Sequence, residues 1–303
     1  MCIEAKALKI VIAGGAGTLG RVLAKHLQSQ GSEVVVLSRR NTQVDGARVL
    51  VWDGLTVSES WASELAGSVL INLSGELVDR VPTDSNIQIL ENSRVEPTKA
   101  LAEAARTFGE PKLWLQMSTL AIYGDAGYQV LTESSSEASG PRQMAGVARA
   151  WEAAAKDAPA SRKVILRTAV VLQPGTPALN RLVKITKLFL GGTVASGRQW
   201  VSWVDYRDFI RALDFIIGHE NISGIVHVTS PNPVTNKSLM QALRKAYRRP
   251  WSPPTPAFLI KLGATLLFRT DPMLALTGRR AVPKKLTESG FKFDVEFIEQ
   301  AIR

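Results

Sequence analysis

The chain has 303 residues, of which 45% are hydrophobic and 21% charged, so it can bury a sizeable core and divide into two domains. Its single cysteine, Cys2, excludes an internal disulfide framework, and its three scattered histidines give no metal-ligand spacing. The formal net charge is +10, but the basic residues form short pairs without interleaved aromatic side chains, so we expect a solvated basic face and no nucleic-acid partner.

No segment indicates export or a membrane span. Glu4 and Lys6 precede any apolar run, and the most apolar later stretch, 257–268, is interrupted by Lys261 and is too short to cross a bilayer. We therefore expect no membrane partner and a location in the reducing cytoplasm. The sequence leaves the oligomeric state open.

Short apolar runs alternate with longer amphipathic stretches over the first half of the chain. The runs of strand length are 9–14, 33–39, 47–53, 68–75, 112–118 and 163–172, and the helix-like stretches between them are 18–30, 58–67, 92–108 and 144–157. Several runs are apolar on both faces, which is typical of buried parallel strands. The alternation predicts an α/β fold, a Rossmann-like doubly wound parallel sheet with right-handed crossovers.

The pattern changes after about Pro174. Helical stretches at 177–192, 205–220 and 236–249 are separated by an irregular segment and by a short apolar run at 224–230. We predict a nucleotide-binding domain over 1–173 and a smaller mixed α/β domain for substrate or interaction over 174–303. The boundary is soft, and some strands of the second part can return to the first sheet.

Three glycines mark the end of the first predicted strand. The spacing Gly14, Gly17, Gly20 predicts a tight turn at the first, close approach of a pyrophosphate at the second, and close packing of helix on strand at the third. Thr18 and Leu19 begin the following helix, whose free amides favour a phosphate. We predict a dinucleotide site rather than a turn without a ligand.

The end of the second predicted strand selects the cofactor. An NAD site would place an acid there, whereas this chain has Ser38, Arg39 and Arg40, with no carboxylate before Asp45. Guanidinium groups suit a 2′-phosphate, which predicts NADP(H); the alternative is that the arginines only solvate a loop. Asp53, after the third strand, either accepts from the adenine amine or is an ordinary turn aspartate.

Three motifs resemble the extended short-chain dehydrogenase/reductase superfamily. They are GGAGTLG (14–20), NLSG (72–75) and STLAIYG (118–124). In such proteins the residue four before the tyrosine of the third motif is the catalytic Ser or Thr, which implies Thr119 here. The resemblance also implies that Tyr123 lies near the nicotinamide.

A narrower resemblance covers nearly the whole chain. The stretches SRVEPTKAL, GRQWVSWV, PNPVTN, PPTPAF and RRAVPKKLTESGFKF are similar to a subfamily known as epimerase-family proteins. Its members are named in some bacteria as sugar-nucleotide epimerases or cell-division inhibitors, and they carry a small C-terminal domain of unknown function. The resemblance supplies no substrate.

The usual proton-transfer pair of the superfamily is missing. Its YxxxK motif would fall on the helix after the fifth strand, where alignment on Glu152 gives Met144 and Ala148. Related dehydratases keep Asp and Glu after the catalytic Thr, and this chain has Leu120 and Ala121 there. Dehydration by that route is therefore not expected.

Other candidate residues each have two interpretations. Tyr123 and Arg149 either form an acid and charge partner, or Tyr123 is a packing residue with a satisfied hydroxyl. Arg94 either reaches a cofactor phosphate or ribose, or makes a surface salt bridge with Glu91 or Glu96.

Backbone contacts with the cofactor are expected from Leu73, Ser74 and Gly75 after the fourth strand, and from Leu172 after the sixth. The residues Arg198, Gln199, Trp200 and Trp203 either form a pocket for a planar or anionic ligand or join the two domains. Asp205 or Asp208 is expected to cap the helix that follows.

The sequence thus supports two functions. The first is an NADP(H)-binding epimerase or oxidoreductase-like protein with an atypical site, in which Thr119 and Tyr123 polarise a small, anionic substrate. The second is a non-catalytic regulator or scaffold whose shape depends on NADP(H). The substrate itself remains unassigned.

Overall fold

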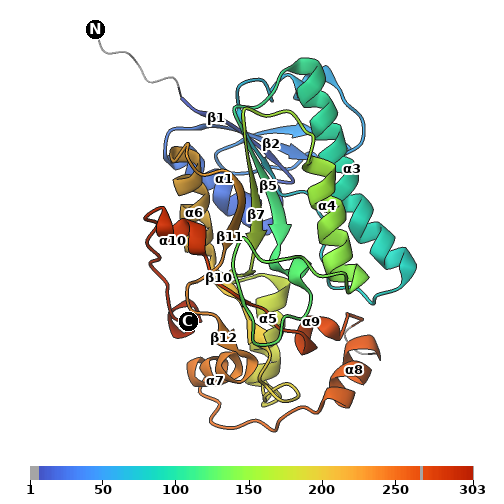
Figure 1. Ribbon diagram of the computed structural model, residues 1–303, viewed down its shortest axis with the longest axis vertical. Helices are drawn as coiled ribbons and strands as arrows, with labels where there is room; N and C mark the ends of the chain where they lie inside the picture. The colour runs from blue at the N-terminus through green and yellow to red at the C-terminus, as the bar shows by residue number, and fades with distance from the viewer. Residues whose placement is uncertain (1–6, 267–268, 303) are drawn as a thin grey trace.

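The computed structural model describes residues 7–266 and 269–302, so Cys2 lies outside the described residues. Seven strands form one parallel sheet in the order β11-β7-β5-β4-β1-β2-β3. They are β1 (Lys9–Ala13), β2 (Glu33–Ser38), β3 (Arg48–Val51), β4 (Val69–Asn72), β5 (Leu113–Thr119), β7 (Arg162–Thr168) and β11 (Gly224–Val228). The predicted doubly wound parallel sheet is confirmed (Figure 1).

The strand order reverses direction at the centre of the sheet. β1 pairs with both β2 and β4, with Ile12 opposite Val36 on one side and Ile71 on the other. From β1 the chain winds outward to β3, and from β4 it winds the other way to β7 and β11. Ligands of such sheets bind in the crevice beyond the carboxyl ends of the strands at this reversal.

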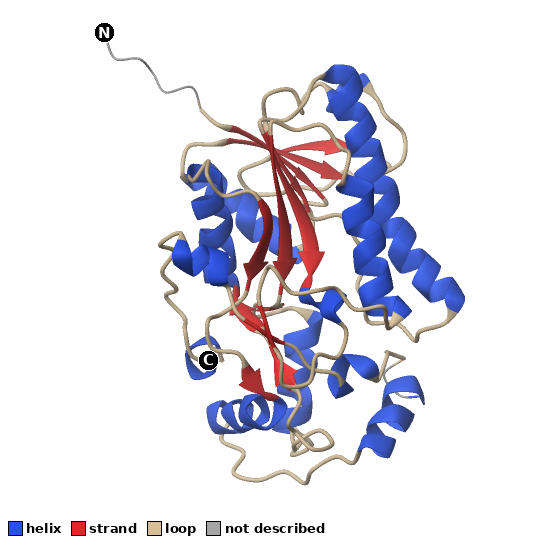
Figure 2. Cartoon of the chain, viewed as in Figure 1, coloured by secondary structure: helices blue, strands red, loops and turns tan. Residues whose placement is uncertain are grey.

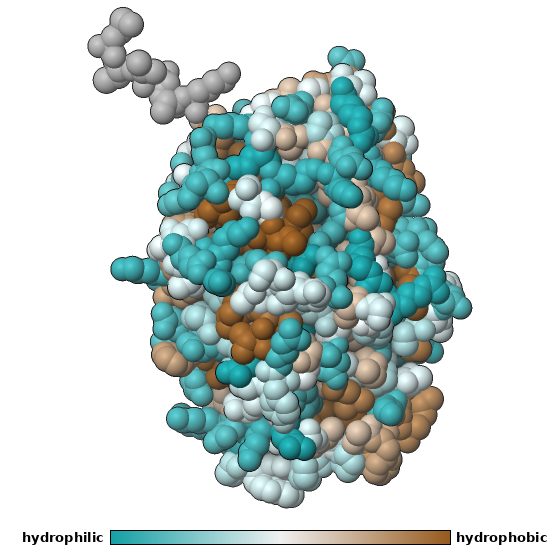
Figure 3. Space-filling view, viewed as in Figure 1, coloured by the Kyte–Doolittle hydropathy of each residue, from teal (hydrophilic) through white to brown (hydrophobic). Residues whose placement is uncertain are grey.

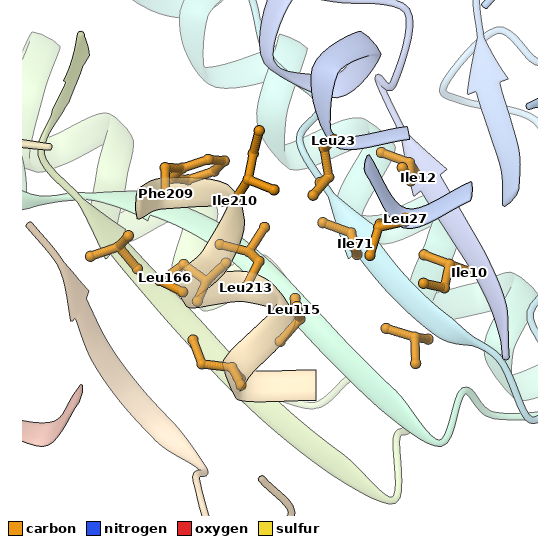
Figure 4. Close-up of a cluster of buried hydrophobic side chains, with 14 of the residues drawn as sticks. Ile10, Ile12, Leu23, Leu27, Ile71, Leu115, Leu166, Phe209, Ile210 and Leu213 are labelled. Carbon is orange, nitrogen blue, oxygen red and sulfur yellow. The ribbon is translucent and has the colours of Figure 1, made fainter. Parts of the chain in front are cut away.

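Helices cover both faces of the sheet. On one face lie α1 (Thr18–Ser29) and α6 (Tyr206–Gly218); on the other lie α2 (Glu59–Ala62), α3 (Asp84–Phe108) and α4 (Val147–Ala155) (Figure 1). Figure 4 shows Leu23 and Leu27 of α1 and Leu213 of α6 against the strand residues Ile12 and Leu115, all buried. Because both sheet faces are covered, central strands such as β1 and β2 carry apolar residues on both faces, as the sequence predicted.

The remaining elements are shorter and lie mostly beyond the carboxyl edge of the sheet, toward which the arrowheads of β5 and β7 point (Figure 2). They are η1 (Leu120–Tyr123), β6 (Val130–Leu131), η2 (Arg142–Gly146), β8 (Val170–Leu172), α5 (Pro177–Lys187), β9 (Trp200–Val201), β10 (Trp203–Asp205), β12 (Val234–Thr235), α7 (Asn236–Ala246), α8 (Ala257–Leu266), α9 (Met273–Leu276), β13 (Arg280–Ala281), α10 (Lys284–Glu288) and α11 (Ile298–Ala301).

This second region has its own core but is not separate from the sheet. Leu172, Trp203 and Leu243 belong to a second buried cluster formed by α5, α7 and the C-terminal segment. However, β11 and α6 also follow residue 174, yet β11 is a strand of the large sheet and α6 packs on one face of that sheet. In addition, β13 pairs with β6 of the first half. Within the described residues, no helix has the length and apolar character needed to cross a membrane.

Candidate functional site

The turn between β1 and α1 contains glycines where a side chain would collide with backbone. Gly14 has φ +73°, which glycine adopts without strain, and its amide donates to the Leu37 carbonyl oxygen at 3.0 Å. A methyl group on Gly20 would lie 2.4 Å from the Gly15 carbonyl oxygen. The close approach of α1 to the strand therefore requires glycine at position 20.

Gly17 differs from these two because it faces open space. Within the described part of the chain, a methyl group there would meet only the Gly14 carbonyl oxygen, at 3.5 Å. Gly17 is the N-cap of α1, and the first turn of this helix contains no acidic residue. Thr18 is exposed, and Leu19 packs against the core. The uncapped amides and the positive helix end thus form a place suited to an anion.

A pocket of about 480 Å³ opens beside this helix start. It is lined by Ala16, Gly17, Thr18, Arg21, Val22, Lys25, Asp45 and Gln173. Arg21 is held by the carbonyl oxygens of Ala16 and Gln43, at 2.9 and 2.7 Å. The Oε1 atom of Gln173 is buried and has no hydrogen-bond partner among the described residues. It is therefore an acceptor available to a ligand.

Two exposed arginines follow β2. The Ser38 hydroxyl accepts from the Arg40 amide at 3.2 Å, at the point where the chain leaves the sheet. The Arg39 side chain is 68% exposed, and its Nη2 lies 3.0 Å from Oε1 of Glu76. The hydrogen bond from Arg39 outweighs burial and lowers the pKa of Glu76. A guanidinium thus stands at the strand end with a carboxylate partner that a phosphate could replace.

The Asp53 carboxylate accepts hydrogen bonds within the turn that follows β3. Its Oδ1 accepts from the amides of Leu55 and Thr56, at 2.8 and 2.7 Å, and its Oδ2 accepts from the Thr56 hydroxyl at 2.7 Å. The bonds from Thr56 and Leu55 lower the pKa of this carboxyl. The structure therefore favours the turn aspartate that the sequence offered as an alternative. A contact with adenine stays a prediction.

The loop after β4 lies against the glycine turn. A methyl group on Gly14 would come within 3.1 Å of the backbone of Leu73 and Ser74. The Ser74 amide donates to Oδ1 of Asn72 at 3.1 Å, while the Ser74 hydroxyl is buried and has no partner in the described structure. Gly75, next along, is exposed. This loop therefore presents backbone and one free hydroxyl at the crevice.

Arg94 on α3 supports the same loop from within. It is 8% exposed, donates from Nη2 to the Glu76 carbonyl oxygen at 2.8 Å, and lies 5.1 Å from the centre of the Trp151 ring. Burial lowers the pKa of Arg94 to about 10. The predicted surface salt bridge with Glu91 or Glu96 is wrong, because the guanidinium is buried under the loop. Its contact with a cofactor stays a prediction.

Thr119 ends β5 at the crevice and is half-buried. Its Oγ1 accepts from the Ala121 amide at 3.1 Å, which caps the single turn η1. Since this bond uses only a lone pair, the hydroxyl proton can be donated to a ligand oxygen. The neighbouring Ser118 is instead committed, with its hydroxyl 2.5 Å from Oε1 of Glu152.

Tyr123, by contrast, points into the protein. It is 4% exposed, and its hydroxyl lies 2.7 Å from Nε2 of His227 and accepts from Nη1 of Arg167 at 2.9 Å. Burial raises the pKa of this phenol, although Arg167 opposes the shift. A hydroxyl bonded in this way is not presented to a substrate. The structure therefore favours the packing interpretation of Tyr123 over the catalytic one.

Arg167 on β7, with 1% exposure, is the centre of this buried network. It donates to the two carboxylate oxygens of Glu152 at 3.0 and 2.8 Å and also pairs with Glu137. Burial disfavours its charge, but the hydrogen bonds to Glu152 outweigh burial and raise the pKa of Arg167. The predicted partnership of Tyr123 with Arg149 is wrong, because Arg149 donates to two backbone carbonyl oxygens of the preceding loop.

Apolar residues fill the two positions where the superfamily has its Tyr and Lys. Met144 and Ala148 are buried, and Ala148 belongs to a cluster with Tyr123. The polar group beside them is Arg279, whose Nη2 lies 3.2 Å from the Met144 sulfur and whose Nε donates to the Gly124 carbonyl oxygen at 2.8 Å. Burial lowers the pKa of Arg279. A cation therefore lies against Met144, the position that the sequence resemblance aligns with the missing tyrosine.

The segment 198–208 does not gather its polar and aromatic residues in one pocket. Trp203 lies in the second core and donates to a backbone carbonyl oxygen, Gln199 donates to the carbonyl oxygens of Val194 and Ala275, and Arg198 is exposed. The hydrogen-bond partners of Trp203 and Gln199 all lie in the second half of the chain, so the joining role stays a prediction.

Two other predicted residues of the second half can be placed. Asp205 caps α6 through the Arg207 amide at 2.8 Å, whereas Asp208 accepts from backbone amides of the C-terminal segment. The Leu172 side chain packs in the second core, so only its backbone can face the crevice.

Sequence reasoning missed Gln173, Arg167 and Arg279. Arg167 had a visible signal, a charged residue inside the apolar run KVILRT. Gln173 directly follows Leu172 but carries no pattern of its own. Arg279 is one of many basic residues near the C-terminus, and only the pairing of β13 with β6 brings it to Met144.

Family comparison agrees with this geometry. Residues 10–228 match the model of the NAD dependent epimerase/dehydratase family, and residues 255–303 match a domain of unknown function. The chain belongs to the NAD dependent epimerase/dehydratase family. This confirms the predicted resemblance to epimerase-family proteins.

Relatives align with the chain along nearly its whole length. An epimerase family protein from Mycobacterium bovis is 32% identical over 97% of this chain and 96% of its own, and YfhF from Bacillus subtilis is 31% identical over 97% of each. Among solved structures, the human epimerase family protein SDR39U1 with NADPH has a TM-score of 0.85 at 24% identity, covering 97% of this chain and 98% of its own. The last comparison supports the fold.

Proposed function

We propose that this member of the family binds NADP(H) and acts as an oxidoreductase or epimerase on a small anionic carbonyl compound. The observation that carries the proposal is the uncapped start of α1, open at Gly17, with Arg39 rather than an acid at the end of β2. Helix amides suit the pyrophosphate, and the guanidinium suits the 2′-phosphate. The human relative that shares this fold was solved with NADPH.

Unsatisfied polar atoms beside the turn support a ligand at this place. The Ser74 hydroxyl and the Gln173 Oε1 atom are both buried and lack partners among the described residues. Buried polar atoms are nearly always hydrogen-bonded in folded proteins, so a ligand would satisfy them. We assign Gly17, Thr18, Ser74 and Gln173 to the dinucleotide, and Arg39 to its 2′-phosphate.

Two side chains can act on a substrate at the other end of the crevice. When bound, NADPH supplies a hydride to a carbonyl carbon. Thr119 can donate its hydroxyl hydrogen to the carbonyl oxygen, and Arg279 can hold an anionic group of the substrate. Arg279 has neutral partners, the Met144 sulfur and the Thr277 hydroxyl at 3.0 Å among them. A proton for the product oxygen then comes from water through Thr119.

A titration with NADPH and NADH in parallel tests the cofactor assignment. Arg39→Ala is expected to weaken NADPH binding by about ten- to a hundredfold and to leave NADH binding unchanged, because a charged hydrogen bond contributes about 1.5–3 kcal/mol. Glu76→Gln is the matched variant: it removes the carboxylate that competes for Arg39 and should not weaken NADPH binding. Equal losses for both cofactors in Arg39→Ala would contradict the 2′-phosphate role.

Transfer of deuterium from 4-deuterated NADPH to a metabolite extract tests the chemistry. We expect labelled product with the native chain and none with Thr119→Val, which should still bind NADPH. Arg279→Met should reduce transfer by raising KM. Transfer that persists in Thr119→Val would remove this residue from the mechanism.

A second function, a regulator that uses NADP(H) without turnover, is favoured by one observation. Met144 and Ala148 cannot transfer a proton, and the Tyr123 hydroxyl is held by Arg167 and His227. Affinity capture from the source organism with and without NADPH tests this function. A partner protein retained in only one of the two conditions supports it, and identical captures count against it.

A further inference from the structure

Two basic segments without acidic residues lie at one end of the molecule. Segments 184–200 and 236–270 hold three and seven Lys or Arg residues, respectively, and neither holds Asp or Glu. The first includes the end of α5, and the second includes α7, α8 and the proline-rich connection between them. These ten cations equal the net charge of the whole chain, +10. The charge of the protein is therefore concentrated in two segments.

Hydrogen bonds bring the two segments together. Arg249 donates to the Lys187 carbonyl oxygen at 3.0 Å, and Arg244 donates to the Gly191 carbonyl oxygen at 2.9 Å. The backbones at 194 and 255 form a bridge just before α8 begins. Figure 1 shows α7, α8 and their connection at the end of the molecule opposite β1 and β2. We call residues 184–195 and 241–266 the basic end.

A pocket of about 540 Å³ lies in the basic end. Its lining is Gln241, Arg244, Lys245, Arg248, Arg249 and Pro250. Within the described chain, none of its four cations pairs with a carboxylate, whereas Arg39, Arg167, Arg181 and Arg207 all do. The positive charge of this pocket is therefore available to an anion from outside.

Both helices that meet here end in a residue with left-handed backbone. Phe189 after α5 has φ +60°, and Arg248 after α7 has φ +53°. Glycine is the usual residue at such helix ends, and the left-handed backbone costs a residue with a side chain about 1 kcal/mol of conformational free energy. The Arg249 guanidinium lies 4.6 Å from the centre of the Phe189 ring. The two helix ends thus present an aromatic ring and cations together on the surface.

Large apolar side chains surround these cations and are exposed to solvent. Trp251 is 68% exposed, and Phe258 and Leu262 of α8 are 67% and 57% exposed. Leu188 and Leu190, on either side of Phe189, are also exposed. In the space-filling view, tan and brown side chains cover the lower right edge where α8 lies (Figure 3). An exposed apolar surface of this kind marks an interaction site.

We propose that the basic end docks on an anionic phospholipid surface. Cations next to Trp, Phe and Leu side chains suit the boundary between headgroups and acyl chains, where the cations meet phosphates and the apolar groups enter the membrane. This inference does not depend on the proposed function. It departs from the sequence expectation of no membrane partner, because the groups that form this surface come from segments that only folding brings together.

Two other occupants fit the basic end less well. A second copy of this chain would bring two positively charged surfaces together, which is repulsive. A nucleic acid would use the cations and could stack on Trp251 and Phe189, but it would leave Leu188, Leu190 and Leu262 unused. Of these three occupants, the lipid surface is the one that uses both the positive and the aliphatic groups.

Co-sedimentation with vesicles tests the proposal. The purified full chain should bind phosphatidylcholine vesicles that contain phosphatidylglycerol, and it should not bind vesicles of phosphatidylcholine alone. Added salt should weaken binding, because part of the attraction is electrostatic. Inorganic phosphate at matched ionic strength should not compete, since a membrane offers many headgroups and an apolar layer; full competition would reduce the site to one for free phosphate and overturn the proposal.

Two variants and a matched control separate the charged and apolar contributions. Lys245→Gln with Arg248→Asn removes two exposed cations, keeps a residue that tolerates the left-handed backbone, and should lower the partition coefficient about thirtyfold. Trp251→Ser with Phe258→Ser should abolish binding that survives high salt. Lys99→Gln with Lys292→Gln removes two exposed cations elsewhere and should lower binding far less. Circular dichroism establishes that each variant is folded.

Three further results would overturn the proposal. One is the absence of binding to anionic vesicles by the folded native chain. Another is an equal loss with the control pair, which would show attraction by net charge alone. The third is retention of duplex DNA, with no vesicle binding, that Lys245→Gln with Arg248→Asn abolishes; this would assign the surface to nucleic acid. Sedimentation velocity adds a check, since a dimer dissociated by Trp251→Ser with Phe258→Ser would assign it to a second copy.

Discussion

The two ends of the crevice along the carboxyl edge of the sheet differ in whether their polar groups are free to bind a ligand. At the β1–β2 end, α1 begins without a cap at Gly17, and Arg39 is exposed. At the β5–α4 end, Met144 and Ala148 are apolar, and the Tyr123 hydroxyl is bonded inside the protein. The difference teaches that polar groups at one end of a crevice can stay open to a ligand while those at the other end are used for packing within the protein.

The largest effect is expected from the buried network at the β5–α4 end. Arg167→Met leaves the Glu152 carboxylate without its cation and should lower the free energy of unfolding by about 3–5 kcal/mol. Arg149→Met is the matched control, because among the described residues Arg149 donates to backbone carbonyl oxygens and to no carboxylate, so its loss should cost about 1 kcal/mol. Urea unfolding measures both. Similar values for the two variants would show that the network contributes little to stability.

The second prediction concerns the glycine turn, where two neighbouring substitutions should act differently. Gly20→Ala should lower the free energy of unfolding by about 3 kcal/mol, because its methyl group would lie 2.4 Å from a backbone oxygen. Gly17→Ala should leave stability within about 0.5 kcal/mol but weaken NADPH binding, because the methyl group would occupy the open space at the helix start. Thermal unfolding and an NADPH titration separate the effects. Unchanged NADPH affinity in Gly17→Ala would place the dinucleotide elsewhere.

The third prediction is a pH dependence that belongs to the β5–α4 end. Burial lowers the pKa of His227 below its usual value of 6.5, so below that pH the unfolded chain binds a proton that the folded chain does not. Stability is therefore present above pH 6.5 and falls as the pH drops through the folded pKa, by at most about 1.4 kcal/mol per pH unit.

The groups that face this imidazole are Tyr123, Arg167, Glu133 and Glu152. His227→Gln should remove the slope that the native chain shows just below pH 6.5, and urea unfolding at several pH values measures it. Parallel curves for the native and His227→Gln chains would contradict the burial argument.

The smallest effect is expected at Asp53. Its carboxylate is occupied by three hydrogen bonds within its own turn, so Asp53→Asn should change NADPH affinity by less than about twofold. The same titration measures this variant. A loss of tenfold or more would restore the contact with the adenine amine.

The sequence by itself determined the sheet, the glycine turn and the arginines after β2. These features depend on local rules: apolar runs form buried strands, Gly17 and Gly20 follow a fixed spacing, and Arg39 directly follows a strand. The missing Tyr and Lys were also visible, because Met144 and Ala148 are single positions in an alignment.

Only the tertiary structure decided which polar groups meet. Tyr123 and Arg167 lie 44 residues apart, and Tyr123 and His227 lie 104 apart, yet their bonds to the Tyr123 hydroxyl turn a candidate acid into a packing residue. The basic end likewise joins segments that are far apart in the chain. Periodicity and spacing describe neighbours along the chain, whereas the burial, charge and hydrogen bonding of a side chain depend on residues that only folding brings beside it.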